Sequence, residues 1–335
     1  MKLFCPEPFE HLEIVPGGDV HVCCSGWIPR PVGNMLETPL MEIFWGGTRL
    51  QEVRNSILDN TFSYCLECPF LPGPCGPVRK VPADLSTDFL REIPLTKINL
   101  LTLAYERTCN LACPSCRTQI FKSDRTHEDQ ARAISLRLID SGALAHVERI
   151  VVTGSGDPFA SPVYLDLFHD LPWHRYPDLK VRLFTDALLC DQAGWQKLGA
   201  AKKRVDQVSV SLDAATPETY AKNRRGDWRK LHANLAALAM LRGLETLNRL
   251  ELTFTVQANN FCEMPAFVDL ATSLGADVVY FGKLRNWGAY TPWDYACRAV
   301  HVPSHPEHGK LLSILKDERL SRPSVVLANF GQVDT

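Results

Sequence analysis

The chain has 335 residues, of which 45% are hydrophobic and 22% charged, with a formal net charge of −2. This balance argues against a dedicated nucleic-acid surface, and no apolar run approaches the roughly 20 residues that a membrane-spanning helix needs. The start of the chain lacks a cationic segment followed by an apolar one, so we expect no secretory signal and a cytoplasmic protein without nucleic-acid or membrane partners.

The front of the chain is rich in cysteine and predicts short elements. Residues 10–24 (EHLEIVPGGDVHVCC) predict two short strands joined by a turn at Pro16–Asp19. Residues 38–60 predict a helix that is interrupted at Gly46 and Gly47. The proline-rich residues that follow predict a linker. We therefore expect a front domain over 1–75, a linker over 76–96, a larger domain over 97–290 and a C-terminal extension over 291–335.

From residue 97 onward, short apolar runs alternate with amphipathic ones. The runs are nearly continuous in apolar residues, as in strands whose sheet is covered by helices. The alternation predicts an α/β fold with a parallel sheet. Six units fall short of the eight in a full barrel, which favours a partial (β/α)6 barrel, with a doubly wound sheet as the rival. The predicted strands are 97–106, 147–154, 178–187, 205–214, 249–257 and 276–284, and the predicted helices are 127–142, 191–204, 228–243 and 263–275.

Nine of the 12 cysteines lie in the first 116 residues. Clustered thiols in a chain without a secretory signal indicate metal ligation rather than disulfides. Cys190, Cys262 and Cys297 stand apart and are typical of small buried hydrophobic residues.

Three of the thiols are packed into the stretch YERTCNLACPSCRTQIF (105–121), with the spacing C-x3-C-x2-C. A closed structural zinc site takes four protein ligands, so three cysteines leave one metal position open for an exogenous ligand. The three are Cys109, Cys113 and Cys116.

A C-x3-C-x2-C stretch after the first strand of a β/α domain resembles the radical S-adenosylmethionine (radical SAM) superfamily. The resemblance implies that Cys109, Cys113 and Cys116 hold a [4Fe–4S] cluster whose open iron binds S-adenosylmethionine. It further implies an external electron donor such as flavodoxin or ferredoxin, and reductive cleavage to a 5′-deoxyadenosyl radical that abstracts hydrogen from a substrate. Ser115 departs from the family, where many members carry an aromatic residue.

Other segments extend the resemblance over roughly residues 95–290. TGSGDP, with Gly154, Ser155, Gly156 and Asp157, is similar to the Gly-Gly-Glu motif and implies contact with the methionyl amine; a plain turn is the alternative. The family's ribose and carboxylate region is matched by Ser209, Ser211 and Asp213. Arg224 or Arg225 is expected to reach the methionine carboxylate, unless both are solvated. The expected adenine and substrate contacts are Val256, Gln257, Phe281 and Gly282, with core packing equally open for Val256 and Phe281.

The front cysteines and the helix between them resemble the SPASM or shorter "twitch" module of the same superfamily. This implies an auxiliary [4Fe–4S] cluster held by Cys5, Cys23, Cys65 and Cys68; a zinc ribbon on the same residues is the alternative. The module usually follows the barrel, whereas here it precedes it. Cys24 is a candidate catalytic thiol or a packed one, and Cys75 an exchangeable ligand or a surface thiol.

The resemblance predicts a radical SAM enzyme that acts on a small polar metabolite, such as a sugar, aminocyclitol or nucleoside, by dehydrogenation, epimerisation or rearrangement. One alternative is a peptide-maturing radical enzyme that forms a crosslink or an epimer. A non-enzymatic iron–sulfur redox protein is the other.

Overall fold

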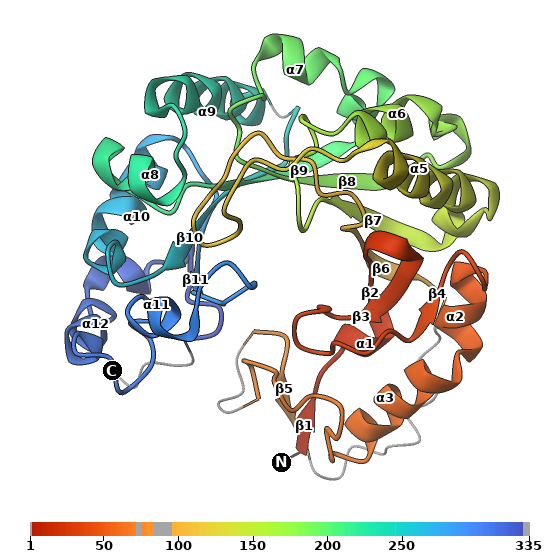
Figure 1. The fold of residues 1–335 in the computed structure, drawn as a ribbon, viewed down its shortest axis with the longest axis horizontal. Coiled ribbons are helices and arrows are strands. Elements are labelled where there is room, and N and C mark those ends of the chain that lie inside the picture. The colour runs from red at the N-terminus through yellow and green to blue at the C-terminus, as the bar shows by residue number, and fades with distance from the viewer. Residues whose placement is uncertain (1, 72–75, 83–95, 245, 331–335) are drawn as a thin grey trace. The chain divides into compact units, whose positions relative to one another are not determined.

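The computed structural model describes residues 2–71, 76–82, 96–244 and 246–330 (Figure 1). The chain divides into two compact units. The first comprises residues 1–107, 123–182 and 199–204, and the second comprises 108–122, 183–198 and 205–335.

The first unit begins with the cysteine-rich front. The predicted hairpin is confirmed, with Leu12 opposite Val22 and a turn in which Gly17 and Gly18 adopt φ values of +86° and +85°. Such positive φ angles strongly favour glycine. The predicted helix is also confirmed with its break at Gly46–Gly47. The elements are β1 (Lys2–Phe4), α1 (Glu7–Glu10), β2 (His11–Ile14), η1 (Pro16–Gly18), β3 (Asp19–Val22), β4 (Gly33–Asn34), α2 (Leu40–Gly46), α3 (Thr48–Leu58) and β5 (Arg79–Val81).

The front hairpin joins the sheet of the β/α repeat. β2 pairs in parallel with β6 (Ile98–Leu103), which pairs in parallel with β7 (Val147–Val152). The strand order in this unit is therefore β4-β3-β2-β6-β7. β5, inside the expected linker, pairs antiparallel with β1, while residues 83–95 of that linker lie outside the described residues.

Two helices lie side by side on one face of β6 and β7 (Figure 1). α5 (Arg125–Asp140) starts at Asp124, whose side chain accepts a hydrogen bond from His127 N, and α6 (Pro162–Asp170) starts at Ser161. These are N-terminal caps that satisfy unpaired amides of the first turn. Arg132 of α5 forms an ion pair with Asp166 of α6. The short elements around them are η2 (Ala143–His146), η3 (Trp173–Arg175) and η4 (Gly199–Lys203).

β8 (Lys180–Thr185) begins in the first unit and ends in the second. The second unit holds four parallel strands in the order β9-β10-β11-β12, with Leu252 opposite both Val210 and Val279. Its strands are β9 (Val205–Ser211), β10 (Arg249–Val256), β11 (Val278–Lys283) and β12 (Val325–Val326). Its helices are α7 (Gln192–Gln196), α8 (Pro217–Asn223), α9 (Trp228–Gly243), η5 (Phe261–Glu263), α10 (Met264–Ser273), α11 (Pro292–Ala296), α12 (His308–Ile314) and η6 (Glu318–Ser321).

All six strands predicted from residue 97 onward are present, and the α/β class with a parallel sheet is confirmed. Curvature of the strands into a partial barrel stays a prediction. The continuous helix predicted over 191–204 is wrong, because α7 ends at Gln196 and Gly199, the first residue of the 3-10 turn η4, adopts a φ of +55°. β12 was not predicted.

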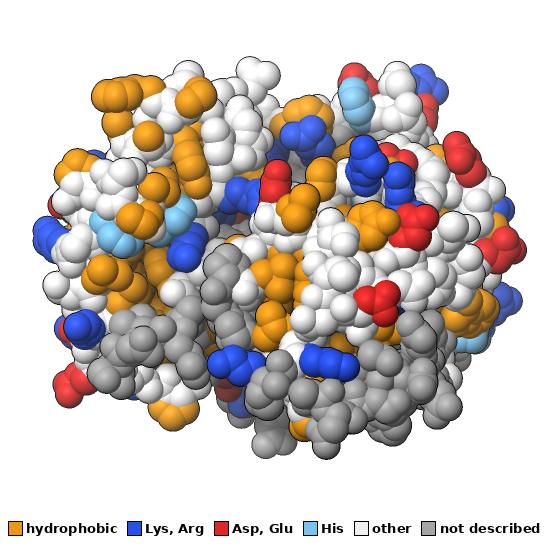
Figure 2. Space-filling model, turned by 90° about the horizontal axis from the view of Figure 1, so that it is seen from below, with side chains coloured by type: hydrophobic (Ala, Val, Ile, Leu, Met, Phe, Trp, Pro, Cys, Tyr) orange, Lys and Arg blue, Asp and Glu red, His pale blue; other side chains and the backbone are white. Residues whose placement is uncertain are grey.

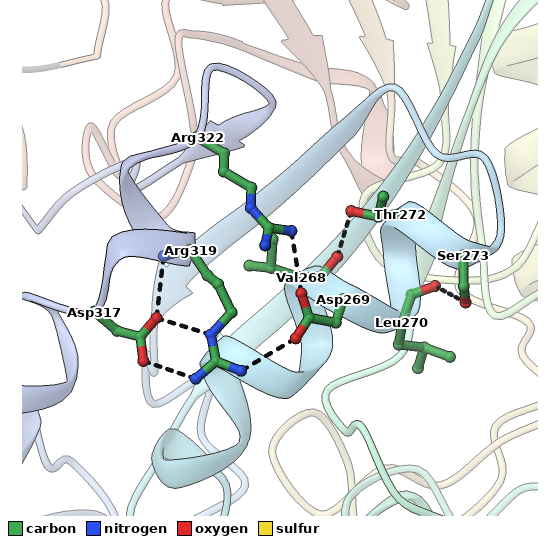
Figure 3. Close-up of polar contacts among 8 residues, drawn as sticks. All are labelled: Val268, Asp269, Leu270, Thr272, Ser273, Asp317, Arg319 and Arg322. Carbon is green, nitrogen blue, oxygen red and sulfur yellow. Dashed lines mark hydrogen bonds and ion pairs between the residues drawn. The ribbon is translucent and has the colours of Figure 1, made fainter.

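The C-terminal segment is tied to α10 by charge (Figure 3). Asp269 accepts hydrogen bonds from Arg319 Nη1 and Arg322 Nη1, each at 3.1 Å. Asp317 Oδ2 accepts another from Arg319 Nη2 at 2.8 Å. These ion pairs fix the segment that directly precedes β12, which pairs with β11 at the edge of the sheet.

No helix among the described residues is long and apolar enough to cross a membrane. On the face drawn in Figure 2, the basic side chains of the described residues lie at several separate places, some of them next to acidic side chains.

Candidate iron–sulfur and ligand-binding site

The C-x3-C-x2-C stretch forms a closed loop in the second unit. Cys109 N donates a hydrogen bond to Phe121 O at 3.0 Å, which joins the two ends of the loop. Cys116 N and Arg117 N both donate to Cys113 O at 2.9 Å, which makes a tight turn at the second and third cysteines. Cys113 is buried, Cys109 half-buried and Cys116 exposed.

One guanidinium group lies within electrostatic reach of all three thiols of this loop. Arg117 Nε lies 3.4 Å from Cys116 Sγ. Burial lowers the pKa of Arg117, but the charges of Cys116, Cys109 and Cys113 outweigh it and raise that pKa above its ordinary value. Cationic surroundings favour thiolates, the form in which cysteine binds iron. The donor set therefore fits a cluster held by three cysteines.

A buried ion pair lies against the loop. Cys113 Sγ is 3.8 Å from Arg224 O, and Arg224 Nη1 donates to Asp213 Oδ2 at 3.2 Å. Asp213, at a φ of +59°, also accepts a hydrogen bond from Thr255 N at 2.6 Å through Oδ1. Burial raises the pKa of Cys113, and the charge of Arg224 opposes that rise. Arg224 Nε is buried and has no partner among the described residues, so it remains available as a donor.

Two polar residues beside the loop were missed by the sequence reasoning. Asn110, inside the C-x3-C spacing, donates through Nδ2 to Asp186 Oδ1 at 3.2 Å. Asp186 is 3% exposed and directly follows β8, while Asp213 lies two residues after the end of β9. The sequence does carry a signal for Asp186, because it is the acidic residue of FTDA at the end of a predicted strand, the edge of an α/β sheet where ligands bind.

The TGSGDP turn lies in the first unit, after β7. Thr153 Oγ1 accepts hydrogen bonds from Ser155 N and Gly156 N, both at 2.9 Å. Asp157 is 1% exposed and accepts from Phe159 N at 2.9 Å through Oδ1, so it caps its own turn. Gly154 is exposed. The expected contact of Asp157 with a methionyl amine stays a prediction.

The remaining candidates of the second unit differ in surroundings. Ser209 Oγ lies 3.5 Å from Gln207 Nε2, and Ser211 Oγ accepts from Thr253 Oγ1 at 3.3 Å. Phe281 is fully buried between Phe254 and Phe267, which favours the core-packing alternative. Val256 is likewise fully buried, Arg225 is exposed, and Gln257 Oε1 is buried without a partner in the described part of the chain.

The front thiols are neighbours in the first unit. Burial raises the pKa of Cys5 to about 12, and the charges of Glu7, Cys68 and Cys65 add to the rise. Burial also raises the pKa of Cys23, together with the charges of Glu7, Cys24, Cys5 and Cys68. Each of the four predicted ligands therefore lies within electrostatic reach of at least two of the others, and four thiols are the donor set of a closed iron–sulfur site.

Cys24 lies in the turn beside this group, where its carbonyl accepts hydrogen bonds from Trp27 N at 2.9 Å and Ile28 N at 3.0 Å. Cys75 lies outside the described residues. Within the described ranges, no three or more His, Cys, Asp or Glu side chains converge on a single metal-ion position.

Comparison with known families identifies this front segment. Residues 5–69 match the SPASM family, an iron–sulfur cluster-binding domain. The front of the chain is a SPASM domain. The match spans Cys5, Cys23, Cys24, Cys65 and Cys68, and it confirms the predicted resemblance of this segment.

Solved structures are similar to the chain at low identity. Streptococcus suis SuiB bound to S-adenosylmethionine is 13% identical over 72% of this chain and 53% of its own, with a TM-score of 0.47. TYW1 with a lysine-pyruvate adduct is 16% identical over 64% of this chain and 71% of its own, with a TM-score of 0.40. Native anSMEcpe with bound AdoMet is 16% identical over 59% of this chain and 57% of its own, with a TM-score of 0.40. No curated protein matches the sequence significantly.

Proposed function

We propose that the protein is a radical SAM enzyme with an auxiliary iron–sulfur cluster in its SPASM domain. The observation that carries the proposal is the closed loop that bears the three thiols, in which Arg117 contacts Cys116. In the same loop, Cys113 lies against Arg224 of the Asp213–Arg224 ion pair. Three thiols suit a cluster that leaves one iron for an exogenous ligand.

Within this proposal, Cys109, Cys113 and Cys116 hold the SAM-binding [4Fe–4S] cluster. When bound, that cluster supplies the electron for cleavage of S-adenosylmethionine. Arg224 would donate a hydrogen bond to the methionine carboxylate through Nε, since its Nη1 already donates to Asp213. An external flavodoxin or ferredoxin is the proposed electron donor.

The auxiliary [4Fe–4S] cluster is proposed on Cys5, Cys23, Cys65 and Cys68. Cys24 follows one of these ligands directly and is proposed as a thiol that faces the substrate. The remaining cosubstrate contacts are proposed at Gly154, Ser155, Gly156, Ser209 and Ser211.

Two substrate classes follow from the resemblance, a small polar metabolite and a peptide. A peptide is the first to test. SuiB has been solved with its precursor peptide SuiA, and anSMEcpe with the Cp18Cys peptide.

Anaerobic reconstitution and reduction in the presence of S-adenosylmethionine test the proposal. We expect about eight iron atoms per chain and formation of 5′-deoxyadenosine. A Cys109→Ala, Cys113→Ala, Cys116→Ala variant should keep about four iron atoms and form no 5′-deoxyadenosine. Wild-type protein that binds iron but never forms 5′-deoxyadenosine would instead support a non-enzymatic redox protein.

A further inference from the structure

Glu13 is a buried carboxylate that no motif of the sequence singled out. It lies on β2, opposite Thr102 of β6, and is 8% exposed. Its Oε2 accepts a hydrogen bond of 2.6 Å from Ser25 N, in the turn that directly follows Cys23 and Cys24. One oxygen of Glu13 is thus fixed by the SPASM domain.

The other oxygen of Glu13 faces the TGSGDP turn. A Cβ placed on Gly154 would lie 3.6 Å from Glu13 Oε1 and 3.1 Å from Ala104 Cβ. Oε1 accepts no hydrogen bond within the described part of the chain, and it is not among the fully buried polar atoms. Because Gly154 is exposed and has no side chain, a ligand seated on the turn can approach this oxygen.

The two carboxylates near the turn, Asp157 and Glu13, differ in how accessible their oxygens are to a ligand. Asp157 is almost fully buried and uses Oδ1 for Phe159 N. Glu13 keeps Oε1 beside the exposed backbone of Gly154. A carboxylate in this setting gains most from a partner that carries positive charge, because a buried charge is costly unless paired.

We propose that Glu13 binds a protonated amino group of a ligand seated against the Gly154 turn. The inference rests on the proposed function and deepens it, since the amine belongs either to S-adenosylmethionine or to the substrate. Glu13 then joins the turn after Cys23 and Cys24 to the exposed turn at Gly154.

Glu13→Gln separates binding from a purely structural role. A glutamine keeps an oxygen that accepts from Ser25 N but loses the charge, so thermal unfolding should stay close to wild type. Asp157→Asn tests the rival assignment, because it makes the same carboxylate-to-amide change at the residue that the sequence predicts to contact the methionyl amine.

The first measurement is the affinity of reconstituted holoenzyme for S-adenosylmethionine by anaerobic calorimetry. The second is titration of the SAM-loaded enzyme with n-butylammonium, with n-butanol as the neutral probe, followed by the EPR signal of the reduced cluster. Loss of one charge-assisted hydrogen bond corresponds to about tenfold weaker binding.

If Glu13→Gln weakens S-adenosylmethionine by about tenfold while Asp157→Asn does not, Glu13 binds the cosubstrate amine. If only the response to n-butylammonium is lost, Glu13 binds the amine of the substrate. The inference is overturned if Glu13→Gln changes neither, or if Asp157→Asn has the larger effect. Wild-type holoenzyme that binds no S-adenosylmethionine would instead refute the proposed function.

Discussion

A single carboxylate, Asp186, ties the cysteine loop to the strand behind it. Its Oδ1 accepts from Asn110 Nδ2 at 3.2 Å and from Leu188 N at 2.9 Å. In Asp186→Ala both donors lose this acceptor, so we expect the loop to open more often and the cluster to be lost several-fold faster to an iron chelator. Asp186→Asn keeps an acceptor and should remain near wild type.

Decay of the iron–sulfur absorbance after chelator addition measures this effect. Asp178→Ala, at an exposed aspartate, is the control. Equal decay rates for Asp186→Ala and the control would show that Asp186 does not hold the loop.

At the scale of elements, Arg54 joins three helices of the SPASM domain. Its side chain on α3 is 1% exposed, and it donates to Pro8 O in α1 at 2.9 Å and to Phe44 O in α2 at 2.7 Å. The guanidinium also lies 4.8 Å from the centre of the Phe44 ring. Burial lowers the pKa of Arg54 to about 10, so it stays charged at neutral pH.

Arg54→Ala should therefore destabilise the front of the chain by about 3 kcal/mol or more, because two charge-assisted hydrogen bonds and their packing are lost. Arg54→Lys keeps the charge but lacks the planar guanidinium, so its stability should lie between those of wild type and Arg54→Ala. The urea midpoint at pH 7 measures both changes. Arg49→Ala, at an exposed arginine of the same helix, is the control, and a midpoint for Arg54→Ala equal to it would refute the bracing role.

The segment around α12 should make stability depend on pH through His301. Burial lowers the pKa of His301 to about 4, and the charges of Lys283, His308 and His305 add to the shift. In the unfolded chain this histidine has its ordinary pKa of 6.5, so on acidification it takes up a proton there before it does so in the folded chain. The contribution of neutral His301 to stability is therefore complete above about pH 6.5 and is lost as the pH drops towards about 4.

The urea midpoint of wild type should accordingly drop between pH 7.5 and 5.0, and His301→Gln should drop less. His174→Gln, at an exposed histidine, should keep the wild-type dependence. Parallel pH curves for wild type and His301→Gln would exclude His301 as the source.

In the molecule as a whole, the front of the chain is held by strand pairing in the sheet as well as by the cluster proposed on its thiols. We expect Cys65→Ala to remove the auxiliary cluster, leaving about four iron atoms and slow cleavage of S-adenosylmethionine without substrate turnover. Hydrogen exchange should rise over residues 60–70, because the proposed cluster would no longer organise this segment. β2 should stay protected, since its backbone pairs with β3 and β6.

Cys262→Ala, at an exposed cysteine, should keep all of the iron and all activity. Full iron content in Cys65→Ala would show that another residue completes the auxiliary site. Loss of protection throughout β6 and β7 would show that the first unit depends on that cluster.

Local patterns in the sequence were enough to predict the six strands of the β/α repeat, the front hairpin and the helix break at Gly46–Gly47, and they single out the two sets of thiols. These features depend on periodicity, turn chemistry and spacing over about ten residues, which act locally. Backbone angles in loops were not predictable in this way: the helix expected to run to residue 204 ends at Gln196, and Gly199 adopts a positive φ.

Which distant residues meet could be seen in the folded chain alone. The parallel register of β2 with β6 places Glu13 against Gly154, and the loop closure places Asn110 against Asp186, 76 residues away. Arg54 looks like an ordinary surface residue in the sequence but is enclosed by three helices. Such contacts depend on sheet register and packing, in which a shift of one residue turns every side chain to the opposite face, and no local pattern encodes that choice.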